Sequence, residues 1–298
     1  MLKSAVAALA ILLCPGRNAQ AVSGSIRDVE HVVMLMMENR SFDQILGSLS
    51  GVRGFDDPNA FVFPNGNSVF YQPQGTNYVL PFHPTNQCID DVAHDWYLGH
   101  VAWDQGQWDR WIPARSPRAM TYCTRDDLSF LYALADAYTV CDSYFCSIVG
   151  PTFPNRLYHF TGTIDPHGTG GGPVLENFVP SGGFTWTTYA ERLQAAGISW
   201  RVYQSSSDYM DGNPLRWFAQ FKSLRPGDPL YDSGLALVPD VVSAFRGDVA
   251  SNTLPQVSWI VPGWSVSEHP PFPASSGQRL FSSQYLKTPS PDFSGFRL

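Results

Sequence analysis

The sequence has few charged residues, and its basic residues form no cluster. Only 15% of the 298 residues are charged, and 19 basic side chains stand against 26 acidic ones, for a net charge of −7. Proteins that bind nucleic acid usually concentrate lysine and arginine on one surface. This chain offers no such concentration, so we do not expect nucleic acid or another polyanion as its partner.

A hydrophobic run long enough to span a bilayer is also missing. The apolar run near the N-terminus covers residues 5–13, which is too short for a transmembrane helix. Lys3 precedes this run, and the A-x-A pattern of residues 19–21 follows it, an order typical of a secretory signal peptide. We therefore expect residues 1–21 to be a signal peptide that is cleaved after Ala21, and the protein to be secreted or periplasmic.

The alternative for this segment is a lipoprotein signal at Cys14. Leu13 argues against it, because the residue is bulky where such a signal needs a small side chain. Cleavage after Ala21 would remove Lys3 and Arg17 and change the net charge from −7 to −9.

Cysteine is scarce, and the cysteines show no C-x-x-C spacing. An exported chain would keep four of them, which allows two disulfides in three alternative pairings. They are Cys88, Cys123, Cys141 and Cys146. Without paired spacing they do not predict a structural zinc site.

Two common catalytic motifs are absent, as are internal repeats. The glycines of residues 168–173 lack the Lys-Ser/Thr that completes a P-loop, and no G-x-S-x-G turn of an α/β-hydrolase is present. These absences exclude two large enzyme classes.

The chain does contain predicted strands and helices in alternation. Strands are predicted over residues 29–37, 138–145, 198–203 and 256–261, and helices over residues 41–49, 128–135 and 187–196. Alternation with strongly apolar strands predicts an α/β fold, with a mostly parallel sheet covered by helices on both faces. Residues 50–120 and 163–184 read as long loops whose aromatic content favours ordered, site-forming segments.

The first candidate site follows the strand of residues 29–37, where Glu38 and Asn39 stand at the carboxyl end. Ligands of parallel sheets bind at such ends, and both side chains offer oxygen atoms to a divalent cation. The plain alternatives for Glu38 are an ion pair with Arg40 and a negative charge at the N-terminus of the following helix.

Thr152 is the second candidate, because it lies at the start of a predicted helix that Pro154 opens and Gly162 ends. A hydroxyl there could act as a nucleophile if a base or a metal activates it. The physical reading of the residues alone favours a simple helix cap. Asn155 and Arg156 follow in the same turn, and such an arginine is commonly a surface or loop-bracing residue.

Two histidines complete the candidate set. His94 lies among acids and a tryptophan in CIDDVAHDW, and His269 follows the strand of residues 256–261 in PGWSVSEHPP. His94 could transfer a proton or contact phosphate, and His269 stands at a strand end where a site residue is expected. The alternatives are a structural role for His94 and, for His269, an exposed loop made rigid by Pro270 and Pro271. A structural role is the default for the remaining histidines, which are His31, His83, His100, His159 and His167.

Several long segments, in their order along the chain, resemble one bacterial family. The chain is similar to the phosphoesterases that include non-haemolytic phospholipases C and related acid phosphatases. The similar segments are VEHVVMLMMENRSFDQILGSLSGVRGF, residues 120–166, TWTTYAERLQAAGISWRVYQ and LPQVSWIVPGWSVSEHPP. The resemblance covers almost all of residues 29–278. It implies an alkaline-phosphatase-like α/β fold and a hydrolase of phosphoester bonds.

The resemblance also implies roles for the candidates. Glu38, Asn39 and Thr152 would bind a divalent metal of unknown identity, and Thr152 would be the nucleophile that forms a phosphoryl-enzyme. Asn39 would lie near the phosphoryl group, and His94 and His269 would contact its oxygens or assist the leaving group.

One departure from the family lies after Gln278. The family continues into a further helix and a strand that ends in D-E-x-x-G-x-x-D-H, whose acids complete the metal site. This chain instead continues with RLFSSQYLKTPSPDFSGFRL. We therefore expect an incomplete phosphoesterase domain over residues 22–278, a divergent tail over residues 279–298 and weak metal binding.

The resemblance leaves three functions open. The leading hypothesis is a phospholipase C that cleaves phosphatidylcholine-like lipids, with peripheral contact to the membrane surface; the others are an acid phosphatase and a non-catalytic remnant. A group of tryptophans could form a cage for a quaternary ammonium, although packing within the loop is the favoured reading. They are Trp96, Trp103, Trp108 and Trp111.

Overall fold

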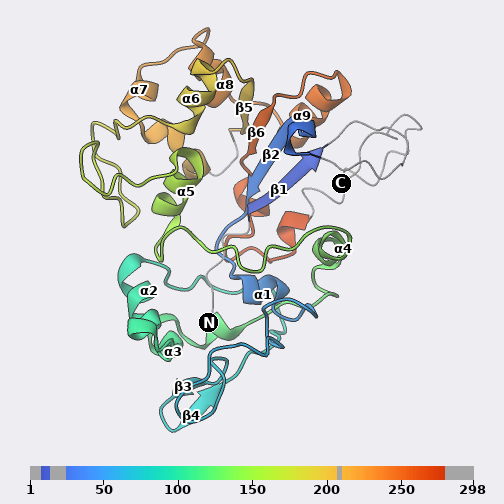
Figure 1. Cartoon of the computed structure of the whole chain (residues 1–298), viewed down its shortest axis with the longest axis vertical. Helices are drawn as coiled ribbons and strands as arrows, with labels where there is room; N and C mark the ends of the chain where they lie inside the picture. The colour runs from blue at the N-terminus through green and yellow to red at the C-terminus, as the bar shows by residue number, and fades with distance from the viewer. Residues whose placement is uncertain (1–7, 14–24, 207–209, 279–298) are drawn as a thin grey trace.

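The computed structural model describes residues 8–13, 25–206 and 210–278. Its main sheet lies in one half of the molecule, and a small two-stranded hairpin lies at the far end of the other half (Figure 1). In the described part of the chain, no helix is both long and apolar enough to cross a membrane.

The strands and helices are short. The strands are β1 (Ala8–Leu13), β2 (His31–Met36), β3 (Gln72–Gln74), β4 (Asn77–Val79), β5 (Trp200–Tyr203) and β6 (Val257–Ile260). The α-helices are α1 (Phe42–Leu46), α2 (Trp96–Trp103), α3 (Trp111–Arg115), α4 (Ser129–Ala137), α5 (Thr152–Thr161), α6 (Tyr189–Ala195), α7 (Ala219–Lys222), α8 (Pro229–Gly234) and α9 (Val241–Ala250).

The main sheet has the order β1–β2–β6–β5 and is mostly parallel. β6 pairs in parallel with both β2 and β5, whereas β1 pairs antiparallel with β2. The predicted α/β class is therefore confirmed. β1 falls inside the predicted signal peptide; its cleavage stays a prediction, and it would leave β2 at the edge of the sheet.

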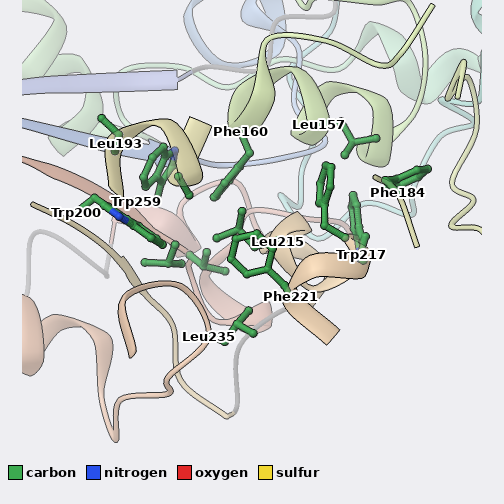
Figure 2. Packing of buried hydrophobic residues seen from close by; sticks show 14 of the residues in the cluster. Leu157, Phe160, Phe184, Leu193, Trp200, Leu215, Trp217, Phe221, Leu235 and Trp259 are labelled. Carbon is green, nitrogen blue, oxygen red and sulfur yellow. The ribbon is translucent and has the colours of Figure 1, made fainter. Parts of the chain in front are cut away.

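Helices cover both faces of this sheet, as predicted. On one face, Trp259 of β6 stacks on Phe160 of α5 with ring centroids 5.1 Å apart, within a large apolar cluster that also holds Leu157 (Figure 2). On the other face, Val33 of β2 belongs to a cluster with Phe245 of α9. Successive strand residues thus serve opposite faces, the period expected of a sheet buried on both sides.

Most predicted elements are present with shorter bounds. β2, β5 and β6 confirm three of the four predicted strands, and α1, α4 and α6 confirm the three predicted helices. The helix predicted between Pro154 and Gly162 is α5, and Gly162 ends it with a φ of 76°. Thr188 and Glu191 form a capping box at the start of α6.

The strand predicted over residues 138–145 is wrong. These residues form turns and bends, and the side chains of Tyr138, Tyr144 and Phe145 are exposed. Their aromatic content imitates a buried strand, but they pair with no strand of the described sheets.

The segment of residues 50–120 is ordered, as predicted, but it is not a plain loop. It contains β3, β4, α2 and α3, which pack around a cluster that includes Phe70 and Trp111. The buried side chain of Gln72 ties this region together by donating to the backbone oxygens of Val69 and Trp108. Residues 163–184 contain no helix or strand, as predicted. The four cysteines from Cys88 onward form no disulfide.

Candidate active site at the carboxyl end of the sheet

Two chain segments meet beyond the carboxyl ends of β2 and β6. Glu38 follows β2, and its backbone N–H donates to the carbonyl oxygen of Ser267, 3.2 Å away, on the segment that follows β6. Asn39 and Glu268 have φ values of 62° and 71°, a left-handed conformation that is uncommon for residues other than glycine. The predicted site thus lies where the segment after β2 contacts the segment after β6.

Thr152 does not cap its helix through its side chain. It is the first residue of α5, and the side chain of the capping residue, Pro151, makes no capping hydrogen bond. The Thr152 hydroxyl instead donates to Glu38 Oε1 at 3.3 Å, and both side chains are buried. The helix-cap reading is therefore wrong, and the hydroxyl faces a carboxylate that can accept its proton.

Arg156 lies four residues after Thr152 and pairs with Glu38. Arg156 Nη2 and Nε lie 2.6 and 3.2 Å from Glu38 Oε2, and Nη1 donates to the carbonyl oxygen of Gly212. Its side chain is 3% exposed, so the surface role is wrong, whereas the hydrogen bond to Gly212 agrees with the loop-bracing role. The i, i+4 spacing on α5 was the signal in the sequence that could have placed both side chains on one helix face.

Arg40 is not the partner of Glu38. Its guanidinium donates to the backbone oxygens of Glu268 and Phe272, at 2.9 and 2.7 Å. Arg40 therefore fixes the segment after β6 against the segment after β2.

Asn39 gathers the two predicted histidines. Its Nδ2 atom lies 2.8 Å from His269 Nε2 and 3.5 Å from His94 Nε2, and also donates to Asp91 at 3.4 Å. The two imidazole rings are 6.5 Å apart. All five predicted site residues thus come together, although they are spread over more than 230 positions of the sequence.

The backbone fixes the tautomer of each histidine. His94 Nδ1 lies 2.8 Å from the carbonyl oxygen of Val92, and His269 Nδ1 lies 2.6 Å from that of Pro270. A carbonyl oxygen only accepts, so in both rings Nδ1 carries the proton and Nε2 faces Asn39 as an acceptor.

Sequence reasoning missed three acids near this site. Asp91 lies within reach of both histidines, and its position three residues before His94 was a visible signal. Burial raises the pKa of Glu268 to about 8, against the opposing charge of Arg40. Burial and the negative charge of Glu38 raise the pKa of Asp211. No local pattern pointed to Glu268 or Asp211.

Glu38, Asn39, His94 and Thr152 line a cavity of about 120 Å³. Four arginines and three acids are among its charged lining residues, namely Arg40, Arg115, Arg118, Arg156, Glu38, Asp90 and Asp91. The fixed charge of its wall is therefore positive in a chain whose net charge is −7. An anionic group such as a phosphoester fits this balance.

The donor set does not by itself fit a tightly held divalent cation. Calcium and magnesium take six or more oxygen ligands, usually with several carboxylates. Glu38 Oε2 already accepts hydrogen bonds from Arg156, and no group of three His, Cys, Asp or Glu side chains in the described ranges could hold a metal ion. Metal binding by Glu38, Asn39 and Thr152 stays a prediction.

The tryptophans pack rather than form a cage in the described region. Trp111 is buried and stacked on Trp108, with the Arg115 guanidinium 5.1 Å from the centroid of its ring. Trp96 lies on His100, with centroids 3.8 Å apart. The packing interpretation is confirmed for Trp96, Trp108 and Trp111, whereas Trp103 is 39% exposed.

Comparison with known proteins identifies the family. The sequence profile of the phosphoesterase family matches residues 29–288. The chain belongs to the phosphoesterase family. It is 46% identical to a non-hemolytic phospholipase C of Pseudomonas aeruginosa over 83% of this chain and 37% of that protein. It is 43% identical to the non-hemolytic phospholipase C of Burkholderia pseudomallei, over 91% of this chain and 43% of that protein.

A more distant relative is phospholipase C B of Mycobacterium tuberculosis, which is 38% identical over 85% of this chain and 54% of that protein. The chain therefore spans between about a third and a half of the length of these relatives. The resemblance to the phosphoesterase family that the sequence suggests is confirmed.

Proposed function

We propose that this phosphoesterase-family chain hydrolyses phosphodiesters in the manner of a phospholipase C. The substrate class is a phosphatidylcholine-like lipid, and the products are diacylglycerol and a phosphorylated alcohol. The observation that carries the proposal is the hydrogen bond from the Thr152 hydroxyl to Glu38, beside Asn39 and on a cavity with a positive wall. The names of the relatives support the substrate class.

In the first step, Thr152 Oγ1 attacks the phosphorus atom. The hydroxyl proton passes to Glu38 Oε1, its hydrogen-bond acceptor, and a Thr152–phosphorus bond forms. The bond from phosphorus to the diacylglycerol oxygen breaks. The imidazolium form of His94 or His269, which carries a second proton on Nε2 besides the one on Nδ1, gives its Nε2 proton to that leaving oxygen.

In the second step, water attacks the phosphoryl-Thr152. The imidazole that has lost its proton accepts one from this water, and Thr152 Oγ1 leaves and recovers its proton from Glu38. The phosphorylated alcohol departs, and each group regains its starting protonation state.

Arg156 and Asn39 support these steps without exchanging protons. Arg156 holds Glu38 through two hydrogen bonds to Oε2, which leaves Oε1 directed at Thr152. Asn39 Nδ2 lies next to Nε2 of both histidines, where it can donate to a phosphoryl oxygen.

A divalent cation at Glu38, Asn39 and Thr152 is part of the proposal that needs its own test. The chain is treated with a chelator, its bound metals are measured, and turnover is compared before and after single divalent cations are restored. Loss and recovery of turnover support the cation, whereas full turnover without any bound metal contradicts it.

Export and contact with a lipid surface are also proposed. The predicted signal peptide supports export. Tyr97 on α2 is 70% exposed, and Tyr144 and Phe145, exposed by about half, directly precede the cavity residue Cys146. Large exposed aromatic side chains beside a site favour contact with a membrane surface. Sedimentation with phosphatidylcholine vesicles tests this contact.

Turnover of two chromogenic esters tests the reaction class. The full chain is assayed with p-nitrophenylphosphorylcholine, a diester, and p-nitrophenyl phosphate, a monoester. We expect preferred hydrolysis of the diester and a loss of at least a thousandfold in Thr152→Ala. Thr76→Ala is the matched control, because Thr76 is exposed in the turn between β3 and β4.

Preference for the monoester would favour an acid phosphatase instead. A folded, soluble chain that hydrolyses neither ester would favour the non-catalytic remnant. Full activity in Thr152→Ala would remove Thr152 as the nucleophile.

A further inference from the structure

Arg115 is a buried cation on the cavity that the proposed reaction does not use. It is the last residue of α3, its side chain lines the same cavity as Thr152 and Glu38, and the residue is only 8% exposed. Neither the sequence patterns nor the proposed steps give it a role.

The contacts of Arg115 leave part of its guanidinium unused. Nη1 donates to the backbone oxygen of Ala93, the residue before His94, and the group lies over the ring of Trp111. Nε is buried and has no hydrogen-bond partner within residues 8–13, 25–206 and 210–278. Among the described residues, no carboxylate oxygen lies within 4.0 Å of a guanidinium nitrogen of Arg115.

The other arginines of the cavity are more fully engaged. Arg156 pairs with Glu38, Arg118 pairs with Asp90, and Arg40 donates to two backbone oxygens. In the described part of the chain, Arg115 has one backbone acceptor and the face of Trp111, and these satisfy its charge less well than a carboxylate does.

A buried charge without a counter-ion is costly, and a bound anion removes the cost. Burial lowers the pKa of Arg115, and the negative charges of Asp95 and Asp91 act in the opposite direction. Asp95 is itself engaged, because its Oδ1 accepts from the backbone of Leu98 at the start of α2. An arginine stays protonated at any physiological pH, so the unmatched charge persists.

We propose that Arg115 binds an anionic oxygen of the substrate in this cavity. The inference rests on the proposed function, which it deepens, because it names the residue that holds the negative charge of a phosphoester. The anionic oxygen has two sources: an unesterified oxygen of the phosphate, or a carboxylate on the alcohol that the phosphate carries. The hydrogen bond from Arg115 to the backbone oxygen of Ala93 also connects a substrate bound at Arg115 to the segment that contains His94.

Binding of inorganic phosphate tests this inference without turnover. The full chain is titrated calorimetrically as wild type, Arg115→Met and Arg115→Gln, where the glutamine can still donate to Ala93 but carries no charge. We expect both variants to bind phosphate about ten- to a hundredfold more weakly. The control is Arg125→Met, because Arg125 is a surface arginine paired with Asp136 and lies outside the cavity. It should bind phosphate as the wild type does.

Two ligands separate the sources of the oxygen. Phosphocholine carries no carboxylate, whereas phosphoserine does. If Arg115→Gln loses affinity for both ligands equally, Arg115 binds a phosphate oxygen. If it loses affinity for phosphoserine alone, Arg115 binds the carboxylate. Either result supports the proposal. Unchanged affinity for all three ligands in a folded Arg115→Gln overturns it.

A wild-type measurement remains if both variants fail to fold. Phenylglyoxal labelling of Arg115, followed by mass spectrometry, is compared with and without phosphoserine, which carries both kinds of anionic oxygen. Protection by phosphoserine supports the proposal, and equal labelling overturns it. If the chain binds phosphate through Arg115 but hydrolyses no ester, the proposed function is contradicted and this inference stands. If Arg115→Gln hydrolyses esters as the wild type does, this inference is contradicted and the proposed function stands.

Discussion

Arg156 Nη2 lies 2.6 Å from Glu38 Oε2, and the two side chains are only 3% and 5% exposed. The pair joins the first turns of α5 to the residue that follows β2. It therefore fixes the distance between Thr152, on the same helix, and the carboxylate that accepts its hydroxyl proton.

Breaking this pair should destabilise the fold strongly. Arg156→Met leaves the Glu38 carboxylate buried without its partner, so we expect a loss of about 3–5 kcal/mol in the free energy of unfolding. Urea denaturation measures it. The exposed pair of Arg125 and Asp136 is the control, because Arg125→Met should cost less than about 1 kcal/mol. Equal losses in the two variants would contradict a special role for the buried pair.

Asn39 allows its backbone and side-chain roles to be separated. Its φ of 62° suits Asn or Gly better than Ala, so Asn39→Ala should be about 1 kcal/mol less stable than Asn39→Gly. Both variants lose the contact to His269 Nε2, so both should lose turnover to a similar extent. Urea denaturation and the diester assay measure the two effects. A glycine variant with normal turnover would show that the amide group is dispensable.

The stability of the chain should depend on pH through Glu268. Burial raises the pKa of Glu268 from 4.5 to about 8 in the folded chain. Between these two pH values the folded chain holds a proton that the unfolded chain has lost, so the free energy of unfolding falls as the pH rises. The contribution is fully present below pH 4.5 and is lost as the pH rises through about 8. Urea denaturation across this range measures it, and Glu268→Gln should show a flatter dependence. The same slope in the variant would assign the effect to another group.

The apolar layer between α5 and the sheet should carry much of the stability. Phe160 is 1% exposed and stacks on Trp259 (Figure 2), so we expect Phe160→Ala to cost about 3–5 kcal/mol by leaving a cavity. Phe178, which is 62% exposed, is the matched control, and Phe178→Ala should change stability by less than about 0.5 kcal/mol. Thermal unfolding of both variants checks the difference. A small effect at Phe160 would mean that α5 is held mainly by its polar contacts.

Local patterns were sufficient to predict three of the four strands of the main sheet, β2, β5 and β6. A few neighbouring residues determine the apolar runs that form β2, β5 and β6. They also determine the helix ends at Thr188 and Gly162. The same reasoning failed at residues 138–145, because an apolar aromatic segment becomes a strand only where a sheet edge can receive it.

The site could be predicted in part for the same reason. Glu38 and Asn39 directly follow the predicted strand of residues 29–37 and lie just beyond β2, so the sequence predicted that they would stand at the carboxyl end of the sheet, where ligands of parallel sheets bind. The α/β class and membership of the phosphoesterase family were likewise readable from the order of the segments.

Only the tertiary structure decided what these residues contact. The hydroxyl of Thr152 could cap its own helix or reach Glu38, and Arg156 could face solvent or the same carboxylate; the choice depends on how α5 packs against β2. The unmatched charge of Arg115 depends on Ala93 and Trp111 meeting around it. Burial and pairing of charges arise from segments far apart in the chain, which no local pattern records.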